Sequence, residues 1–185
     1  MRIIGGDRRK KKLIAVPGLA TRPTSDRVKE TLFNIIQTRV RGAFVLDLFS
    51  GTGALGLEAL SRGADHCLFV DSQKQALDTC RKNISACKYD EKSTVIQWDI
   101  AKNLNCLSRY SKPMDLVFID PPYKKGLADL ALAHLVQVGA IAPDGLVIVE
   151  HAAGDTPEFG DVLSLTETRK YGKTALSFLT PQQEN

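Results

Sequence analysis

The chain lacks the features of a membrane protein, of a disulfide-bonded fold and of a metal centre. No apolar run in its 185 residues approaches the roughly 20 residues of a membrane-spanning helix, and the basic N-terminus has no apolar stretch of a secretory signal. The four cysteines contain no C-x-x-C pair, and the three histidines are scattered. We therefore expect free thiols in a reducing cytoplasm, with no zinc or other metal site.

The remaining composition is that of an ordinary folded protein, with 43% hydrophobic and 25% charged residues. The length suggests one domain, which can bury about 70% of its unfolded surface and needs no cross-link. The net charge is only +4, yet residues 1–41 hold eleven Lys and Arg against three Asp and Glu. This asymmetry predicts a polyanionic partner, with nucleic acid favoured over a merely solvated basic end.

Hydrophobic periodicity predicts an α/β fold. Residues 2–4 and 13–16 indicate a small N-terminal β-hairpin with a basic tip, and a helix capped by Thr24 or Ser25 should end at Gly42. Beyond it, strands are expected at 44–49, 67–70, 94–98, 116–119, 145–149, 162–170 and 174–179. Helices should end near residues 62 and 86 and occupy 101–108 and 126–138. The alternation predicts a mostly parallel sheet covered by helices on both faces, closed by an antiparallel hairpin at one edge.

A glycine-rich turn follows the first core strand. Gly51, Gly53 and Gly56 fit the pattern G-x-G-x-x-G, and Asp71 lies twenty positions after Gly51, at the end of the next strand. Glycines permit close backbone approach to a nucleoside, and a carboxylate accepts hydrogen bonds from ribose hydroxyls. The arrangement predicts a nucleoside site, although a tight turn without a ligand is the simpler alternative.

Three acidic residues lie at three successive strand ends: Asp47, Asp71 and Asp99. They suit a cationic ligand that carries adenosine, such as S-adenosylmethionine (SAM), better than a dinucleotide, whose pyrophosphate prefers a helix N-terminus. Asp99 has the alternative role of capping the following helix. The expected cofactor-binding residues are Asp47, Phe49, Ser50, Gly51, Gly53, Asp71, Ser72, Asp99, Ile100 and Asp120.

The tetrapeptide from Asp120 to Tyr123, Asp-Pro-Pro-Tyr, follows the apolar run 116–119. The prolines cannot continue the sheet, so they form a rigid loop at the strand's carboxyl end, where open α/β sheets bind ligands. Asp120 and the carbonyl of Pro121 can accept hydrogen bonds from an amine, and Tyr123 can stack on a flat heterocycle. We therefore expect Asp120, Pro121 and Tyr123 to be catalytic, with a turn carboxylate and a ring over the core edge as the alternative.

These motifs resemble those of the RsmD-type enzymes among the class I SAM-dependent methyltransferases. The segment 47–53 and the Asp-Pro-Pro-Tyr loop are similar to the SAM-binding and amino-methylating motifs, and 1–6, 22–34 and 171–172 are similar to RsmD-type signatures. The resemblance implies a Rossmann-like, seven-stranded sheet with an antiparallel last strand. It also implies methylation of the guanine N2 amine in 16S ribosomal RNA, within the small ribosomal subunit or an assembly intermediate.

The resemblance therefore predicts two parts. Residues 1–41 form an RNA-contacting extension, and residues 42–185 form a methyltransferase domain. The phosphate contacts are expected from Arg8, Arg9, Lys10, Lys11 and Lys12. The resemblance also implies that the segment with Arg22, Arg27 and Lys29 faces the substrate base, although salt bridges on the helix surface explain these residues equally well.

Three other functions stay open at this point. A nicotinamide-dependent oxidoreductase shares the glycine-rich turn and Asp71, but it does not explain Asp120. A DNA adenine-N6 methyltransferase shares both motifs, yet it normally needs a target-recognition region for which this chain has little room. A non-catalytic RNA-binding assembly factor could retain the fold but would be expected to lose the motif carboxylates. Nothing in the sequence requires more than a monomer.

Overall fold

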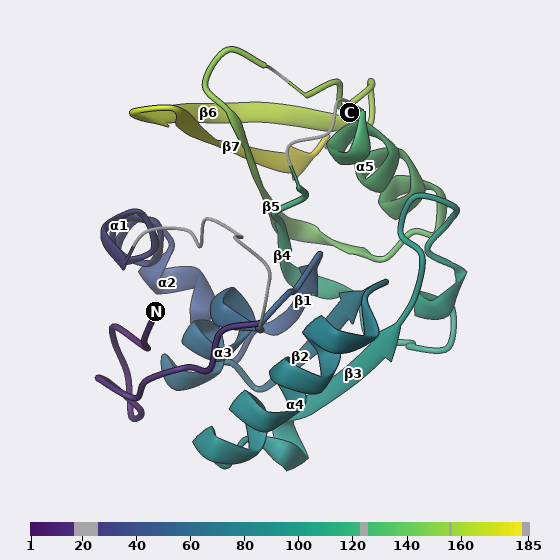
Figure 1. Cartoon of the computed structure of the whole chain (residues 1–185). Helices are drawn as coiled ribbons and strands as arrows, with labels where there is room; N and C mark the ends of the chain where they lie inside the picture. Colours follow the sequence, from purple (N-terminus) through teal and green to yellow (C-terminus); the bar gives the residue numbers. More distant parts are fainter. Residues whose placement is uncertain (17–25, 123–125, 156, 183–185) are drawn as a thin grey trace.

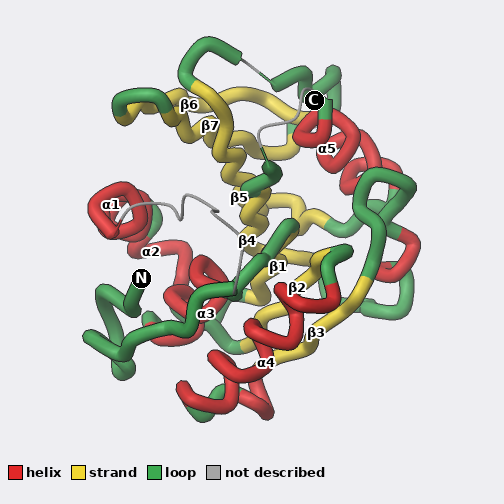
Figure 2. The backbone as a smooth tube through the Cα atoms, in the orientation of Figure 1, coloured by secondary structure: helices red, strands yellow, loops and turns green. Residues whose placement is uncertain are grey.

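One seven-stranded sheet runs through the whole protein (Figures 1 and 2). The computed structural model describes residues 1–16, 26–122, 126–155 and 157–182. The strands are β1 (Phe44–Leu48), β2 (His66–Asp71), β3 (Ser93–Gln97), β4 (Met114–Ile119), β5 (Ile141–Ala152), β6 (Leu163–Tyr171) and β7 (Thr174–Pro181). Their order is β3-β2-β1-β4-β5-β7-β6. Strands β1 to β5 pair in parallel, while β7 pairs antiparallel with both β5 and β6, as the resemblance implied.

The helices lie on both faces of this sheet (Figure 1). They are α1 (Asp26–Ile35), α2 (Gln37–Val40), α3 (Ala54–Ser61), α4 (Lys74–Cys87) and α5 (Leu127–Gln137), with 3₁₀ turns at Asp90–Lys92 and Asn105–Leu107. Residues of α1 to α4 pack in one hydrophobic cluster, and α5 and the second 3₁₀ turn pack in the other. Among the described residues, no helix is long and apolar enough to span a membrane.

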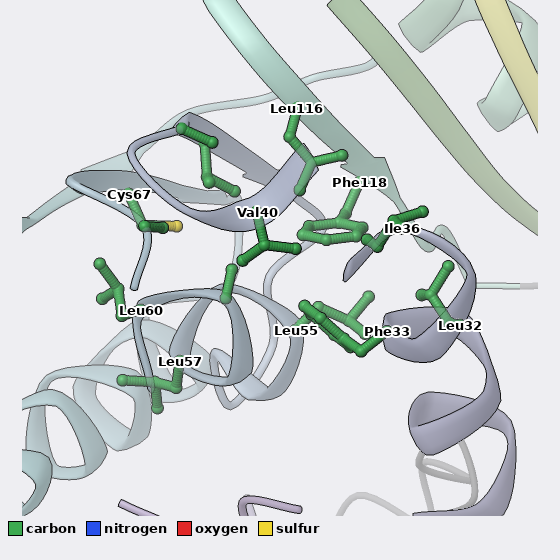
Figure 3. Packing of buried hydrophobic residues seen from close by; sticks show 14 of the residues in the cluster. Leu32, Phe33, Ile36, Val40, Leu55, Leu57, Leu60, Cys67, Leu116 and Phe118 are labelled. Carbon is green, nitrogen blue, oxygen red and sulfur yellow. The ribbon is translucent and has the colours of Figure 1, made fainter. Parts of the chain in front are cut away.

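Alternating residues of the central strands supply the two clusters. In β1, Val45 points to the cluster with α1 to α4, and Leu46 and Leu48 point to the cluster with α5. Figure 3 shows the first cluster, where Phe33 of α1 packs against Phe118 of β4 with ring centroids 5.6 Å apart. Both faces are covered, so most residues of the central strands are apolar rather than alternating with polar ones, and Asp47 in β1 is an exception.

The N-terminal segment contributes to this packing. Ile3 and Leu13 are buried in the same cluster as α1 and α3. The two arms of the segment pair antiparallel at one bridge, Arg2 with Lys12. The arms also exchange backbone hydrogen bonds, from the Ile3 amide to the Lys11 carbonyl and from the Lys10 amide to the Ile3 carbonyl, each at 2.9 Å, which confirms the small hairpin. The amides of Ile4 and Gly5 donate to the Glu58 carboxylate of α3, each at 2.8 Å, and so hold the hairpin to that helix.

The departures from the sequence-based elements are local. The helix expected over 101–108 is reduced to the 3₁₀ turn Asn105–Leu107, because the Asp99 and Asn103 side chains accept from the amides of Ala101 and Asn105. The helix expected to end at Gly42 is interrupted at Ile36, whose carbonyl accepts from the amide of Arg39, three residues on. The fifth strand is longer than 145–149 and spans Ile141–Ala152.

Candidate active site

The glycine-rich turn links β1 to α3 in a conformation that most residues avoid. Phe49, Gly51 and Gly53 have φ angles of 58°, 53° and 78°. Gly53 precedes the first helical residue, and its amide donates to the Ser50 carbonyl at 2.7 Å. A Cβ atom on Gly53 would lie 2.7 Å from the Cys80 sulfur, so a side chain there would be both strained and overpacked.

Gly56 brings α3 close to the sheet. A Cβ atom at this position would lie 2.4 Å from the Phe69 ring and 2.5 Å from the Cys67 sulfur. Its amide donates at 2.9 Å to the carboxylate of Asp47, which is 2% exposed under the turn. Burial raises the pKa of Asp47 to about 8, and the nearby Asp71 carboxylate adds to this, while the Gly56 hydrogen bond opposes it. A cation above the turn would favour the ionised form of Asp47.

Asp71, the last residue of β2, forms hydrogen bonds with the glycine-rich turn and with the residue before α4. One carboxylate oxygen accepts from the amide of Gly51 at 2.9 Å, and the other accepts from the amide of Gln73 at 2.8 Å. A carboxylate can accept about four hydrogen bonds, so capacity remains for ribose hydroxyls.

Two observations at the turn fit a bound nucleoside. The hydroxyl of Ser50 is buried and has no hydrogen-bond partner among the described residues. Gly51 faces open space among the described residues, because the nearest described atom to a Cβ there would be the Phe49 carbonyl oxygen, at 3.9 Å. A ligand above the turn can therefore approach the backbone and offer Ser50 a partner.

An open hollow of about 500 Å³ lies at the carboxyl ends of β2 and β3. Its lining residues are Ser72, Gln97, Trp98, Asp99, Lys102 and Asn103. The Asp99 carboxylate accepts from the amide of Ala101 at 3.2 Å and lies 3.5 Å from the Lys102 ammonium. Asp99 thus caps the following turn and borders the hollow as well. Ile100, the next residue, is buried below it.

Asp120 lies beside the glycine-rich turn. Strand β4 pairs with β1 up to Leu48 and Ile119, and the Asp120 amide then donates to the Leu48 carbonyl at 3.5 Å. Asp120 is half-buried and Pro121 is buried. Tyr123 lies outside the described residues. The sheet therefore brings Asp120 and Pro121 next to Phe49, at the end of the neighbouring strand.

The basic residues of the N-terminus have different environments. Arg9, Lys10, Lys11 and Lys12 are exposed, as is Arg27 on α1. Arg8 is held to the protein, because its Nε donates to the Cys87 carbonyl at 2.8 Å and its guanidinium lies over the Tyr89 ring. Arg22 lies outside the described part of the chain.

Lys29 corrects the expectation that it faces the substrate. Its side chain is 1% exposed and its ammonium lies 3.2 Å from the Glu58 carboxylate, which is also buried. It donates to the Arg2 carbonyl at 2.6 Å as well. The sequence does not reveal this pair. Glu58 is a single polar residue within the apolar helix pattern 54–61, and that local pattern does not indicate a partner elsewhere in the chain.

Glu150 was also assigned no role, although it lies two residues before the end of β5. It is 7% exposed and follows Val149, which pairs with Ile119, so Glu150 and Asp120 are neighbours at the sheet edge. An acidic residue directly after the apolar run 146–149 is the sequence signal that could have identified it. His151, the next residue, is structural in its contacts, since its ring bonds to Ser177 and to the Ala152 carbonyl.

Comparisons with known proteins identify the family. The profile of the family described as "Conserved hypothetical protein 95" matches residues 1–180. "Putative rRNA methyltransferase YlbH" of Bacillus subtilis is 35% identical over 178 residues, covering 96% of this chain and 97% of that protein. "Ribosomal RNA small subunit methyltransferase D" of Escherichia coli is 36% identical over 150 residues, covering 81% of this chain and 74% of that protein.

The fold agrees with these relatives. The solved structure of "Putative methyltransferase yhhF from Escherichia coli" superimposes with a TM-score of 0.86 and 33% identity, covering 100% of this chain and 99% of that one. A profile that matches nearly the whole chain, with relatives above 30% identity, shows that this protein belongs to the RsmD family, described as Conserved hypothetical protein 95.

Proposed function

We propose that this protein transfers the methyl group of SAM to the exocyclic N2 amine of a guanine in the 16S RNA of the small ribosomal subunit. The observation that carries the proposal is the position of Asp120 and Pro121 beside the glycine-rich turn, where the Asp120 amide reaches the Leu48 carbonyl. The names of the curated relatives support a ribosomal RNA substrate. The cytoplasm is the compartment that this substrate implies.

The residues at the edge of the sheet fit SAM. Ser50 and Gly51 would meet the ligand over the turn, and Asp71 would accept from its ribose hydroxyls. Ser72 and Asp99 border the hollow that would take the adenine. The buried Asp47, at the end of β1, would lie below the positive charge. When bound, SAM supplies an electrophilic methyl group on a positively charged sulfur.

The chain's own contribution is to orient a weak nucleophile. The lone pair of an aromatic amine is delocalised into the ring, so the amine must be turned toward the methyl group. Asp120 and the Pro121 carbonyl can each accept one N–H of that amine, which favours the pyramidal nitrogen that attack requires. Asp120 would also accept the excess proton that the amine nitrogen carries once it is methylated. Proximity and orientation of this kind are worth up to about 7–11 kcal/mol.

The exposed cations at the N-terminus would hold the RNA, with Arg9, Lys10, Lys11 and Lys12 touching phosphates. Arg27 on α1, and Arg22 and Tyr123 outside the described residues, belong to the same hypothesis: the two arginines near the substrate and the tyrosine stacked on the target base. A stack on one aromatic ring is worth about 1–3 kcal/mol.

The deciding experiment incubates the protein with methyl-labelled SAM and small ribosomal subunits from a strain that lacks the gene. Digestion and mass analysis of the 16S RNA should find one N2-methylguanosine. Label on an adenine, on a ribosomal protein or nowhere would refute the proposed function.

Asp120→Ala tests the chemistry separately from the binding of SAM. The variant should lose methyl transfer while calorimetry still detects SAM binding. Asp161→Ala, which removes an exposed carboxylate from the loop before β6, is the matched control and should transfer methyl groups at the parent rate. An Asp120→Ala variant with parent activity would show that this carboxylate has no role in the transfer.

A further inference from the structure

The basic N-terminal loop is fixed against α3 and α4. The amide of Asp7 donates to the Ser61 carbonyl at 2.9 Å, and the amide of Arg8 donates to the Ser61 hydroxyl at 3.0 Å. Gly6 makes this contact possible, because it has a φ of +77° and a Cβ atom there would lie 1.6 Å from the Ser61 carbonyl oxygen. The loop is therefore ordered before any RNA binds.

The same loop also contacts the end of α4. Arg8 donates to the Cys87 carbonyl, and the Tyr89 hydroxyl bonds to the Asp7 carboxylate. Burial raises the pKa of the Cys87 thiol, and the positive charges of Lys11 and Arg8 oppose that shift, so both cations lie near the helix end. The carboxylate of Asp7 is occupied by Tyr89 and Arg8.

Exposed lysines of α4 continue this surface. The residues of α4 that face the loop include Asn83, which bonds to Ile14, and Cys87. Lys82 precedes Asn83 and lies one turn after the buried Thr79, and Lys88 is the residue that caps the helix. Both lysines are exposed. Arg81 pairs with Asp78 at 3.1 Å, so its charge is already compensated within α4.

This surface lies away from the catalytic edge. The base of the N-terminal segment is at the glycine-rich turn, where Asn83 bonds to both Ile14 and the Thr52 carbonyl. Its tip contacts Ser61 and Cys87, the last residues of α3 and α4. The 8 residues of α3 that separate the glycine-rich turn from Ser61 span about 12 Å, since a helix rises about 1.5 Å per residue. Figure 1 shows the tip beside the end of α4 that points away from β4.

We propose that the exposed cations of the loop (Arg9 to Lys12), together with Lys82 and Lys88 of α4, form one preformed binding surface for an RNA backbone at the ends of α3 and α4, about 12 Å along α3 from the glycine-rich turn. The proposal rests on the proposed function and defines its substrate class. The substrate is a folded RNA that reaches both the catalytic edge and the opposite end of α4, not a short strand around the target guanine. The surface contributes affinity without reading sequence, because its side chains address phosphates.

The first test is the salt dependence of binding to 16S RNA from a strain that lacks the gene. Removing one cation that binds a phosphate should flatten the plot of log K against log salt by about 0.7 to 0.9, so Lys82→Gln/Lys88→Gln should flatten it by roughly 1.5. Lys112→Gln is the control, since Lys112 is exposed on the face of Phe44, opposite the N-terminal loop, and should leave the slope unchanged. A double variant with the parent slope would overturn the proposal.

The second test measures the distance along the RNA. All four native cysteines are buried, so Lys11→Cys provides a single site for an iron–EDTA probe. Hydroxyl radicals should cut the RNA at nucleotides remote from the methylated guanine, and Lys88→Cys should cut the same region. Cuts at the methylated guanine itself, or no cuts in an RNA that the enzyme methylates, would overturn the extended surface. Absence of methyl transfer by the parent protein would instead refute the proposed function. The salt dependence of binding would still test the extended surface in that case, so the two failures can be told apart.

Discussion

Replacing Glu58 by glutamine should destabilise the protein strongly, because Glu58 is the centre of a buried network. Its carboxylate accepts from the amides of Ile4 and Gly5 and from Arg62 Nε, each at 2.8 Å, and lies 3.2 Å from the Lys29 ammonium. Glu58 and Lys29 are 0% and 1% exposed. Glutamine has one acceptor oxygen in place of the two carboxylate oxygens, so it can keep only some of these hydrogen bonds. Lys29 also loses the negative charge that compensates its own.

The expected destabilisation follows from that burial. Removing one partner of a buried ion pair costs about 3–5 kcal/mol. Domains have about 5–15 kcal/mol of stability in total, so this is a large share. A domain of this size loses about 2–4 °C in Tm per kcal/mol, so Glu58→Gln should melt roughly 6–20 °C below the parent.

The pH dependence adds a second signature. Burial already lowers the pKa of Lys29, and Glu58 opposes that shift, so the variant should lower it further. The folded variant then releases the proton at a pH where the unfolded chain still holds it. Its stability should therefore rise with pH toward about 10, and the gap to the parent should narrow.

Urea unfolding followed by circular dichroism measures both effects. Glu30→Gln, on the exposed side of α1, is the matched control and should change stability by less than about 0.5 kcal/mol. Lys29→Met/Glu58→Gln should be more stable than Glu58→Gln alone, because the stranded charge is gone. A Glu58→Gln midpoint equal to that of the parent would refute the reasoning.

Three further outcomes are expected at the glycine-rich turn. The folded protein holds a proton on Asp47 up to about pH 8, while the unfolded chain releases it near pH 4. Without ligand, the free energy of unfolding should therefore decrease as the pH rises from about 4 to about 8. Asp47→Asn should abolish this pH dependence in urea titrations. Gly56→Ala should cost about 1–3 kcal/mol by overpacking against Phe69, whereas Gly154→Ala, whose Cβ would have no described atom within 4 Å, should be neutral in the same assay. Asp71→Ala should weaken SAM binding by about tenfold or more in calorimetry, because charge-assisted hydrogen bonds are worth about 1.5–3 kcal/mol; unchanged affinity would remove Asp71 from the site.

The sequence predicted the layers of the fold because their signals are local. The run 116–119 and the alternation of strand and helix depend on neighbouring residues, and the structure confirms the resulting sheet. Gly53 is similarly readable, since its positive φ is a requirement of the turn itself. The predicted helix boundaries were wrong where a side chain accepts a hydrogen bond from a backbone amide in place of a helical carbonyl. Asp99 and Asn103 do so in the segment 101–108, which was expected to be a helix.

Long-range contacts were not predictable in this way. Lys29 has the sequence signature of an exposed helix residue, and only the packing of α1 against α3 shows that it is buried. The N-terminal arms pair with one another as predicted, but only the structure shows that the amides of Ile4 and Gly5 also donate to a carboxylate more than fifty residues away. No periodicity within either segment records such a partner.

The amino-acid sequence by itself determined the α/β architecture, the glycine-rich turn and the identities of Asp47, Asp71 and Asp120, because turn geometry and strand burial depend on short stretches of chain. Only the tertiary structure decided that Asp120 meets the turn through Leu48, that Lys29 is buried beside Glu58, and that the basic loop joins the far end of α4. These contacts join residues that are distant in the chain, and their energies depend on burial, which exists only after the layers have packed.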